Sequence, residues 1–378
     1  MDFSLSQEQE MFRSSVRKFL DGNGSTQIAR DFIRGDGSSL EKALAGLAGL
    51  GCTAITIPEK YEGAELGSLD LVPVLEELGR AHLPGIYLET LAFSVPLIEK
   101  YGTEQQRQKY LPQIATGSRT VTLAWLEPKG GYHPNEVQTS ASIEGTSLVI
   151  NGTKSSVPEG ETADTYLLLV RTSDGTDGEG LSLVLVDRDE IKVKTRKQKS
   201  FDETRMLAEV TFEKVIVSTD CVLGEINQGW SILQEGLLHI NAALCSLMIG
   251  GMDRLVEMTA EYAKIRVQFG QPIGRFQAIK HRIADMKTDL ETARSLSYYA
   301  TWALETNAAD REAAIFSARA FTTEAYIRIA SHSIQIHGGI GFTEELDCQL
   351  YLKRARYYEN YLGSIQHYRE KAAVALNW

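Results

Sequence analysis

The chain has 378 residues and a formal net charge of -11, with 43% hydrophobic and 24% charged residues. A chain of this length exceeds the usual size of one domain, so we expect two or three domains with a large buried core. The negative charge, without a run of Lys and Arg that would segregate positive charge, argues against nucleic acid as a partner.

The first residues and the cysteines indicate a cytoplasmic protein. No basic segment followed by an apolar one opens the chain, and no stretch reaches the roughly 20 apolar residues of a membrane span. The four cysteines are dispersed and form no C-x-x-C pair, and the seven histidines have no metal-ligand spacing. We therefore expect reduced thiols, no metal site and no membrane span.

The first third of the chain has helical periodicity. Apolar residues recur at helical spacing in 6–20, and the pattern continues in 40–50, 69–78 and 105–114. We predict an N-terminal helical domain at 1–119.

The pattern changes between residues 120 and 222. Short runs rich in Val, Ile, Leu and Thr, such as TYLLLVRT and LSLVLVD, alternate with turn signals at 151–152 and 173–175. This alternation is typical of antiparallel sheets. It predicts a middle antiparallel β domain at 120–225.

Long helical patterns return after residue 228. They cover 230–267, 277–305, 309–336 and 364–375, with Gly-rich breaks at 269–274 and 338–341. Helices of this length are typical of a four-helix bundle, which we place at 226–378. The whole chain is predicted to be an α+β multi-domain protein.

Five strings, in this order, resemble the acyl-CoA dehydrogenase family. They are FSLSQEQEMFR at 3–13, GCTAITIPEKYEGAELGSLDLVPVLEELGR at 51–80, YGTEQQRQKYLPQIATGS at 101–118, RVQFGQPIGRFQAIKHRIADM at 266–286 and QIHGGIGFTEE at 335–345. The resemblance runs almost from end to end. It implies a helical N-terminal domain, a middle β-barrel-like domain and a C-terminal four-helix bundle.

The resemblance also implies a chemistry. Family members oxidise an acyl-CoA thioester to a trans-2-enoyl-CoA: a glutamate removes the α-proton and FAD accepts a hydride from the β-carbon. They form dimers or tetramers and pass electrons to an electron-transfer flavoprotein. We therefore expect FAD as the cofactor and acyl-CoA as the substrate.

Two of the strings imply contacts to FAD across a subunit interface. An Arg suits a pyrophosphate because its planar donors pair with two oxygens, and paired glycines let the backbone approach a phosphate or ribose. The predicted cofactor-binding residues are Arg266, Phe269, Gln277, Gln335, Gly338 and Gly339. The alternatives are that Arg266 is an ordinary residue at a helix end, that the glycines only cap a helix, and that His337, which follows a helical apolar pattern in the second string, is structural.

The strings that face the flavin from the β domain depart from the family pattern. Leu126 stands where the family has a hydroxyl residue before Glu-Pro, and Tyr132 stands where it has a serine. In the second string, Ser156 replaces a tryptophan and Pro158 a threonine. These changes remove groups that would contact the flavin ring.

The family glutamate is also absent. Leu362 occupies its usual position before the last helix, and Ile240 occupies the alternative position on the first long C-terminal helix. Glu235 and Glu359 are the nearest carboxylates, at spacings that need not reach the same pocket. The catalytic residue is therefore unknown from the sequence.

Two functions remain open. The chain is expected to be an FAD-dependent acyl-CoA dehydrogenase, with a displaced base. Alternatively, it is a non-catalytic partner subunit that lends FAD contacts to a second, complete acyl-CoA dehydrogenase subunit in a hetero-oligomer.

Overall fold

A computed structural model describes residues 5–378, so Phe3 and Ser4 of the first family string lie outside the described residues. The chain forms two compact units. The helical unit comprises the described part of Met1–Ala43 together with Ser68–Pro84 and Asn241–Trp378. The sheet unit comprises Leu44–Gly67 and Gly85–Ile240.

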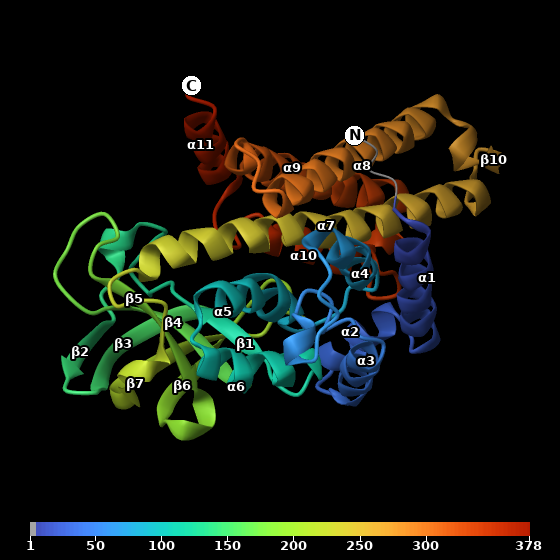
Figure 1. Cartoon of the computed structure of the whole chain (residues 1–378). Helices are drawn as coiled ribbons and strands as arrows, with labels where there is room; N and C mark the ends of the chain where they lie inside the picture. Colours follow the sequence, from blue (N-terminus) through green and yellow to red (C-terminus); the bar gives the residue numbers. More distant parts are fainter. Residues whose placement is uncertain (1–4) are drawn as a thin grey trace. The chain divides into compact units, whose positions relative to one another are not determined.

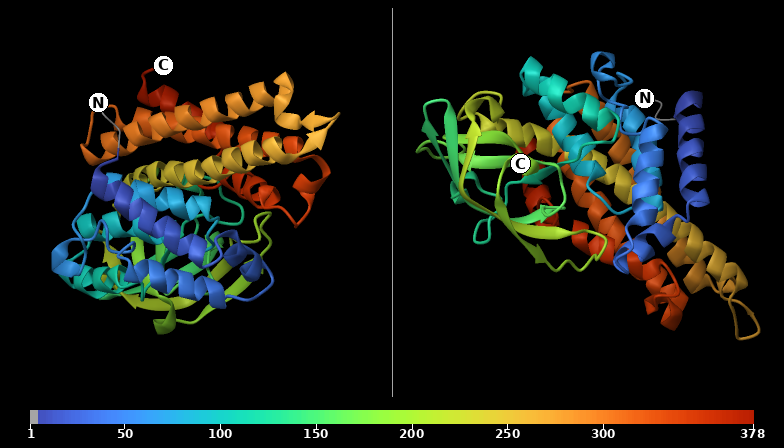
Figure 2. Two further views of the ribbon diagram at one scale, coloured as in Figure 1. Left: turned by 90° about the vertical axis from the view of Figure 1, so that its right-hand side faces the viewer. Right: turned by 90° about the horizontal axis from the view of Figure 1, so that it is seen from below.

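The helical unit is built from long helices, labelled in Figure 1. Its complete helices are α1 (Gln7–Gly22), α2 (Thr26–Ile33), α4 (Ser68–Arg80), α8 (Gln277–Glu305), α9 (Arg311–His337), α10 (Cys348–Tyr358) and α11 (Ile365–Ala375). Two helices continue into the sheet unit, α3 (Ser38–Gly49) and α7 (Gly229–Ile265). Both views of Figure 2 show α8 and α9, in orange, running side by side.

Glycines allow α4 and α7 to cross closely. A Cβ atom added at Gly250 would lie 1.7 Å from the carbonyl oxygen of Glu76, and one added at Gly79 would lie 1.9 Å from that of Leu247. No other residue fits such contacts without moving the backbone. Helix α7 also meets α8 and α9, since Ser246 Oγ lies 3.4 Å from Ser297 Oγ and the Thr259 hydroxyl donates to Ser333 Oγ at 2.9 Å.

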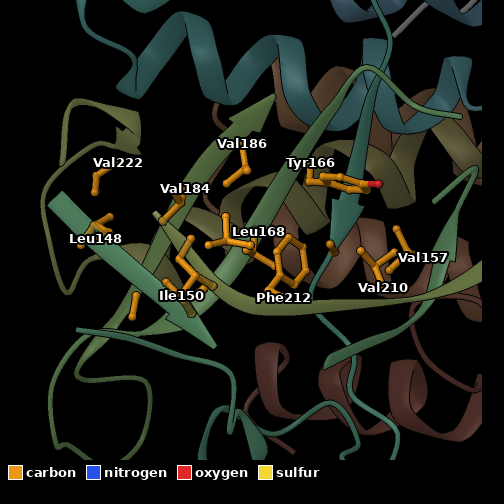
Figure 3. Close-up of a cluster of buried hydrophobic side chains, with 14 of the residues drawn as sticks. Leu148, Ile150, Val157, Tyr166, Leu168, Val184, Val186, Val210, Phe212 and Val222 are labelled. Atoms are coloured by element: carbon orange, nitrogen blue, oxygen red, sulfur yellow. The ribbon is translucent and has the colours of Figure 1, made fainter. Parts of the chain in front are cut away.

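The sheet unit contains a curled eight-stranded sheet and short helices. The strands are β1 (Val121–Ala124), β2 (Ser140–Glu144), β3 (Ser147–Pro158), β4 (Thr165–Arg171), β5 (Leu181–Asp187), β6 (Val193–Gln198), β7 (Leu207–Ser218) and β8 (Val222–Leu223). The helices are a π-helical turn at Glu89–Ser94, α5 (Val95–Tyr101) and α6 (Glu104–Ala115). Figure 3 shows the core that the sheet encloses, where Tyr166 meets Phe212 edge to face at 5.9 Å.

The sheet order is β6-β7-β3-β2-β4-β5-β8, with β1 added beside β4. Most neighbours are antiparallel, as the sequence pattern predicts, but β1 and β2 each pair with β4 in parallel. Strand β2 runs antiparallel to β3 along its length and meets β4 in parallel only at Ser140 and Arg171. The sheet is mixed rather than purely antiparallel.

One helix among the described residues, α7, is long and apolar enough to cross a membrane by length and composition alone. However, 83% of its most apolar window is buried inside the protein. This burial is what a core helix of a soluble protein shows.

Candidate functional site

The Arg266 string forms a hairpin where α7 ends. The chain leaves the helix at Ile265, pairs as β9 (Val267–Gln268) with β10 (Gln271–Pro272), and enters α8 at Gln277. The Ile273 N–H donates to the Arg266 carbonyl at 2.8 Å and closes the hairpin. The turn holds Phe269 in a left-handed conformation (φ 52°) and leaves its side chain 92% exposed.

The second predicted string forms the end of α9. Gln335 is exposed on the last turn, and Gly338 follows the helix with φ 67°, a conformation that favours glycine. Open space surrounds the Cβ positions of both Gly338 and Gly339. A ligand could therefore approach the backbone here.

His337 joins the two strings. Its ring stacks on Tyr262, one turn before Arg266, with the ring centres 4.4 Å apart, and its Nδ1 lies 2.8 Å from the Ser333 carbonyl oxygen. Burial lowers the pKa of His337, against the opposing effect of the Ser333 carbonyl. The histidine is therefore neutral near pH 7, and its environment supports a structural role.

This contact gathers all six predicted cofactor-binding residues at one end of the helical unit. Gln277 belongs to the group because the preceding residue, Phe276, packs edge to face against Phe269 at 6.1 Å. We call the segments 262–277 and 335–342 the open end. Exposed large apolar side chains accompany Phe269 there, namely Ile265, Val267, Ile340 and Phe342.

In the sheet unit, the two strings that depart from the family pattern lie side by side. The Ser155 N–H donates to the Leu126 carbonyl at 2.8 Å, which joins the end of β1 to β3. Ser156 is exposed in a left-handed conformation (φ 54°), and the Tyr132 ring packs against Trp125 at 5.8 Å. The Pro158 carbonyl accepts the hydroxyl of Thr122 at 2.5 Å.

A buried ion pair lies beneath these strings. Lys154 is fully buried, and its Nζ donates to Glu127 Oε1 at 2.8 Å and to the Trp125 carbonyl at 3.2 Å. Burial lowers the pKa of Lys154 to about 8, although Glu127 opposes the shift. Burial alone would raise the pKa of Glu127, but Lys154 and the N–H groups of Thr139 and Gln138 outweigh it and hold that pKa below its usual value. The Lys154 ammonium and the Glu127 carboxylate thus find their partners within the chain, whereas the buried hydroxyl of Thr139 has none in the described residues.

Both positions at which the family carries its glutamate are apolar and closed. Ile240 is 0% exposed, and Leu362 is 4% exposed in a left-handed conformation (φ 62°). The Tyr368 hydroxyl donates to the Leu362 carbonyl at 2.7 Å and fixes the loop. Neither side chain can accept a proton.

Arg319 of α9, which the sequence reasoning missed, ties the surroundings of the two positions together. Its Nε donates to Asn241 Oδ1 at 3.0 Å, next along α7 from Ile240. Its Nη2 donates to the carbonyls of Tyr358 and Tyr361 at 2.8 and 2.9 Å. The side chain is 1% exposed, and within residues 5–378 no carboxylate pairs with it. Arg319 is one of five charged residues of α9, and nothing in the sequence distinguishes it from the other four.

The two displaced carboxylates considered from the sequence are engaged elsewhere. Glu235 lies 3.0 Å from Lys100 Nζ, and Glu359 lies 2.9 Å from Arg356 Nη1. The geometry therefore supports neither carboxylate as a base.

No group of three or more His, Cys, Asp or Glu side chains in the described part of the chain could hold a metal ion.

Comparison with known families gives three matches in chain order. The models described as the N-terminal, middle and C-terminal domains of acyl-CoA dehydrogenase match residues 6–118, 122–215 and 227–376. Together they cover nearly the whole chain.

Individual relatives match over similar lengths. A probable acyl-CoA dehydrogenase of Bacillus subtilis is 28% identical and aligns over 95% of both chains. A subunit of the caffeyl-CoA reductase-Etf complex of Acetobacterium woodii is 29% identical over 96% of both. A solved structure described as the FAD complex of PigA superimposes with a TM-score of 0.92 at 26% identity, covering 100% of this chain and 99% of that one.

Proposed function

The chain belongs to the acyl-CoA dehydrogenase family, and we propose that it is an FAD-dependent enzyme that desaturates an acyl-CoA thioester between its α and β carbons. The observation that carries this proposal is the match of all three family domains, in order, along the chain. When bound, FAD supplies the acceptor for the β-hydride. We place the protein in the cytoplasm as a dimer or tetramer.

The open end fits the phosphates of FAD. Arg266 is exposed there, so its guanidinium is available for a pyrophosphate. Gly338 and Gly339 leave room for a ribose or phosphate against the backbone. The Phe269 ring is exposed, so a nucleotide base can stack on it. These residues are available to a flavin held by a second subunit, with an electron-transfer flavoprotein as the proposed acceptor.

The fit at the flavin ring is poorer. Leu126 and Ser156 supply neither the hydroxyl nor the tryptophan that the family pattern places there, and Pro158 has no backbone N–H. The chain's own contribution to binding FAD is therefore concentrated at the open end.

A second candidate function rests on the closed apolar residues Ile240 and Leu362. A chain without a base at either position would serve as a non-catalytic partner that completes the FAD site of another acyl-CoA dehydrogenase subunit. The relatives found here are named as dehydrogenases and as a reductase-complex subunit, so the comparisons favour the first function.

The visible spectrum of the purified protein tests the two functions. A yellow protein whose flavin is bleached by an acyl-CoA, and which then reduces a dye, establishes the dehydrogenase. A colourless protein that gains flavin only when produced together with a second family subunit overturns it in favour of the partner function.

A further inference from the structure

His367, in the first turn of α11, stands beside the loop that carries Leu362. Its ring lies over Gly363, because a Cβ atom added at that glycine would lie 2.7 Å from His367 Cδ2. Consecutive Cα atoms are about 3.8 Å apart, so the imidazole lies within about one residue's length of the family's glutamate position. The Leu362 side chain is buried, whereas His367 is only half-buried. A ligand beside this loop can therefore reach the histidine.

Two features hold the ring and the loop together. Tyr368 meets the His367 ring edge to face, with the ring centres 5.3 Å apart, and its hydroxyl donates to the Leu362 carbonyl. Gly363 has φ 142°, a conformation that favours glycine, and a larger residue would leave no room for the imidazole. The imidazole and the family's glutamate position are therefore kept close to each other.

The imidazole is in the form that accepts a proton. Burial lowers the pKa of His367 below its ordinary value of 6.5, Lys371 lowers this pKa further, and Glu370 opposes both effects. The ring also stands in the first turn of α11, where the positive end of the helix dipole disfavours an imidazolium. The histidine is therefore neutral near pH 7.

The other ionisable groups at 357–371 are poorer proton acceptors. Glu359 pairs with Arg356 at 2.9 Å, and the exposed Glu370 accepts a hydrogen bond from Gln366 at 3.1 Å. The tyrosines of this segment keep their protons near pH 7, since the ordinary pKa of tyrosine is about 10. His367 is therefore the strongest candidate base beside the closed loop.

A purely structural role does not require an imidazole at this position. The Ser364 hydroxyl accepts the His367 N–H at 3.2 Å and caps α11, but any residue except proline supplies that N–H. A glutamine of similar size would also cover Gly363. A structural role therefore predicts that His367→Gln keeps the reaction.

We propose that His367 is the displaced base of this chain and takes the α-proton of the acyl-CoA thioester. The inference rests on the proposed function, since it assumes an acyl-CoA ligand and a bound FAD. As the α C–H bond breaks, its electron pair forms the α,β double bond, and the β-hydrogen leaves as a hydride, with two electrons, to the flavin. A ring nitrogen of His367 gains the proton and becomes positively charged, and the half-exposed ring then releases the proton to solvent.

The test is exchange of the α-hydrogens of a thia analogue of an acyl-CoA, in which sulfur replaces the β-carbon, with deuterated solvent. This analogue has no β-hydride to give, so mass spectrometry of the exchanged analogue reports removal of the α-proton alone. With the purified, flavin-containing protein, we expect His367→Gln to exchange about 100-fold more slowly than the wild type. The control His332→Gln removes another half-buried histidine, on α9, whose pKa burial also lowers, and should exchange as the wild type does.

A carboxylate at the family position separates a missing base from a damaged site. Leu362→Glu should restore exchange in His367→Gln, whereas in the presence of His367 it should add little, in contrast to a chain in which an absent base limits the reaction. The proposal is overturned if His367→Gln exchanges like the wild type, if His332→Gln is equally slow, or if Leu362→Glu does not restore exchange.

The flavin of the wild type tests the proposed function separately. If an acyl-CoA bleaches it while His367→Gln exchanges like the wild type, the proposal about His367 fails alone. If the wild type exchanges the α-hydrogens through His367 but an acyl-CoA does not bleach its flavin, the proposed desaturation fails and His367 remains the proton acceptor.

Discussion

The open end of the helical unit and the 125–158 region of the sheet unit use their polar groups in opposite ways. At the open end, Arg266 and Phe269 extend from a hairpin and are exposed, while buried contacts such as Tyr262 on His337 only support them. In the sheet unit, Lys154 and Glu127 form hydrogen bonds with each other and with nearby backbone groups. The first region is available to a ligand or a second subunit, whereas the second mainly stabilises its own fold.

The loop that follows α10 resembles the 125–158 region, because its polar groups bond within the fold. Arg319 and Tyr368 donate hydrogen bonds to the carbonyls of Tyr358, Tyr361 and Leu362. The Leu362 side chain is buried. The loop is held firmly, but its residue at the family's glutamate position, Leu362, cannot take a proton. Substitutions in the three regions should therefore differ in their effect on the free energy of unfolding and on the reaction.

Breaking the buried pair of the sheet unit should have the largest effect. Glu127→Gln leaves Lys154 buried without a counter-charge, and we expect a loss of about 4 kcal/mol in the free energy of unfolding. Urea denaturation followed by tryptophan fluorescence measures it, since Trp125 and Trp230 lie in this unit. The double variant Glu127→Gln/Lys154→Met should recover part of the loss; a double variant less stable than the single one would show that the pair is not the cause.

The Lys154–Glu127 pair also makes the free energy of unfolding depend on pH, and the pKa of Lys154 fixes the sign. The pKa of Lys154 is about 8 in the folded protein, below its ordinary value of 10.5, so the unfolded chain binds more protons between these values. Stability from this group therefore rises as the pH increases from about 8 to 10.5. Over this range, the unfolding free energy of the wild type should increase relative to that of the double variant Glu127→Gln/Lys154→Met.

Removing Arg319 should cost slightly less. Arg319→Met removes the hydrogen bonds that the guanidinium donates to Asn241 and to the carbonyls of Tyr358 and Tyr361, and we expect a loss of about 3 kcal/mol in the free energy of unfolding. Arg319→Lys retains a cation and should lose about half as much. Thermal unfolding gives the totals, and faster hydrogen exchange at Leu362 and Gly363 should accompany them. If exchange is unchanged in Arg319→Met, the arginine does not hold this loop.

Restoring a carboxylate at position 362 tests the function of the closed loop. If the absent base limits the reaction, Leu362→Glu should raise acyl-CoA-dependent dye reduction about 100-fold, a typical contribution of a general base. Leu362→Gln is the matched control, since it has similar size and polarity but cannot take a proton at neutral pH. Equal rates in both variants would contradict a missing base at this position.

The sequence predicts the open end better than the closed loop for a physical reason. The end is defined by local signals: α7 and α9 stop at Gly-rich breaks, and the six predicted residues lie next to those breaks. Besides Thr323 in its own helix, Arg319 bonds to residues 39 to 78 positions away, and nothing in the sequence of α9 shows where its guanidinium points. The sequence patterns also missed α2, α5 and α10, because helices of two or three turns repeat the helical period too few times to be recognised.

The open end should show the smallest effect on stability and a clear effect on flavin. Because Arg266 and Phe269 are exposed, Arg266→Gln and Phe269→Ala should each change the unfolding free energy by less than about 0.5 kcal/mol. Loss of a charge-assisted contact to a pyrophosphate should nevertheless weaken FAD binding about tenfold in Arg266→Gln, measured by the fluorescence of released flavin. Arg275→Gln removes a nearby exposed arginine that we do not assign to FAD and serves as the control. If all three variants keep their flavin, the open end is a surface without the predicted ligand, and the contrast with the sheet unit reduces to one of exposure.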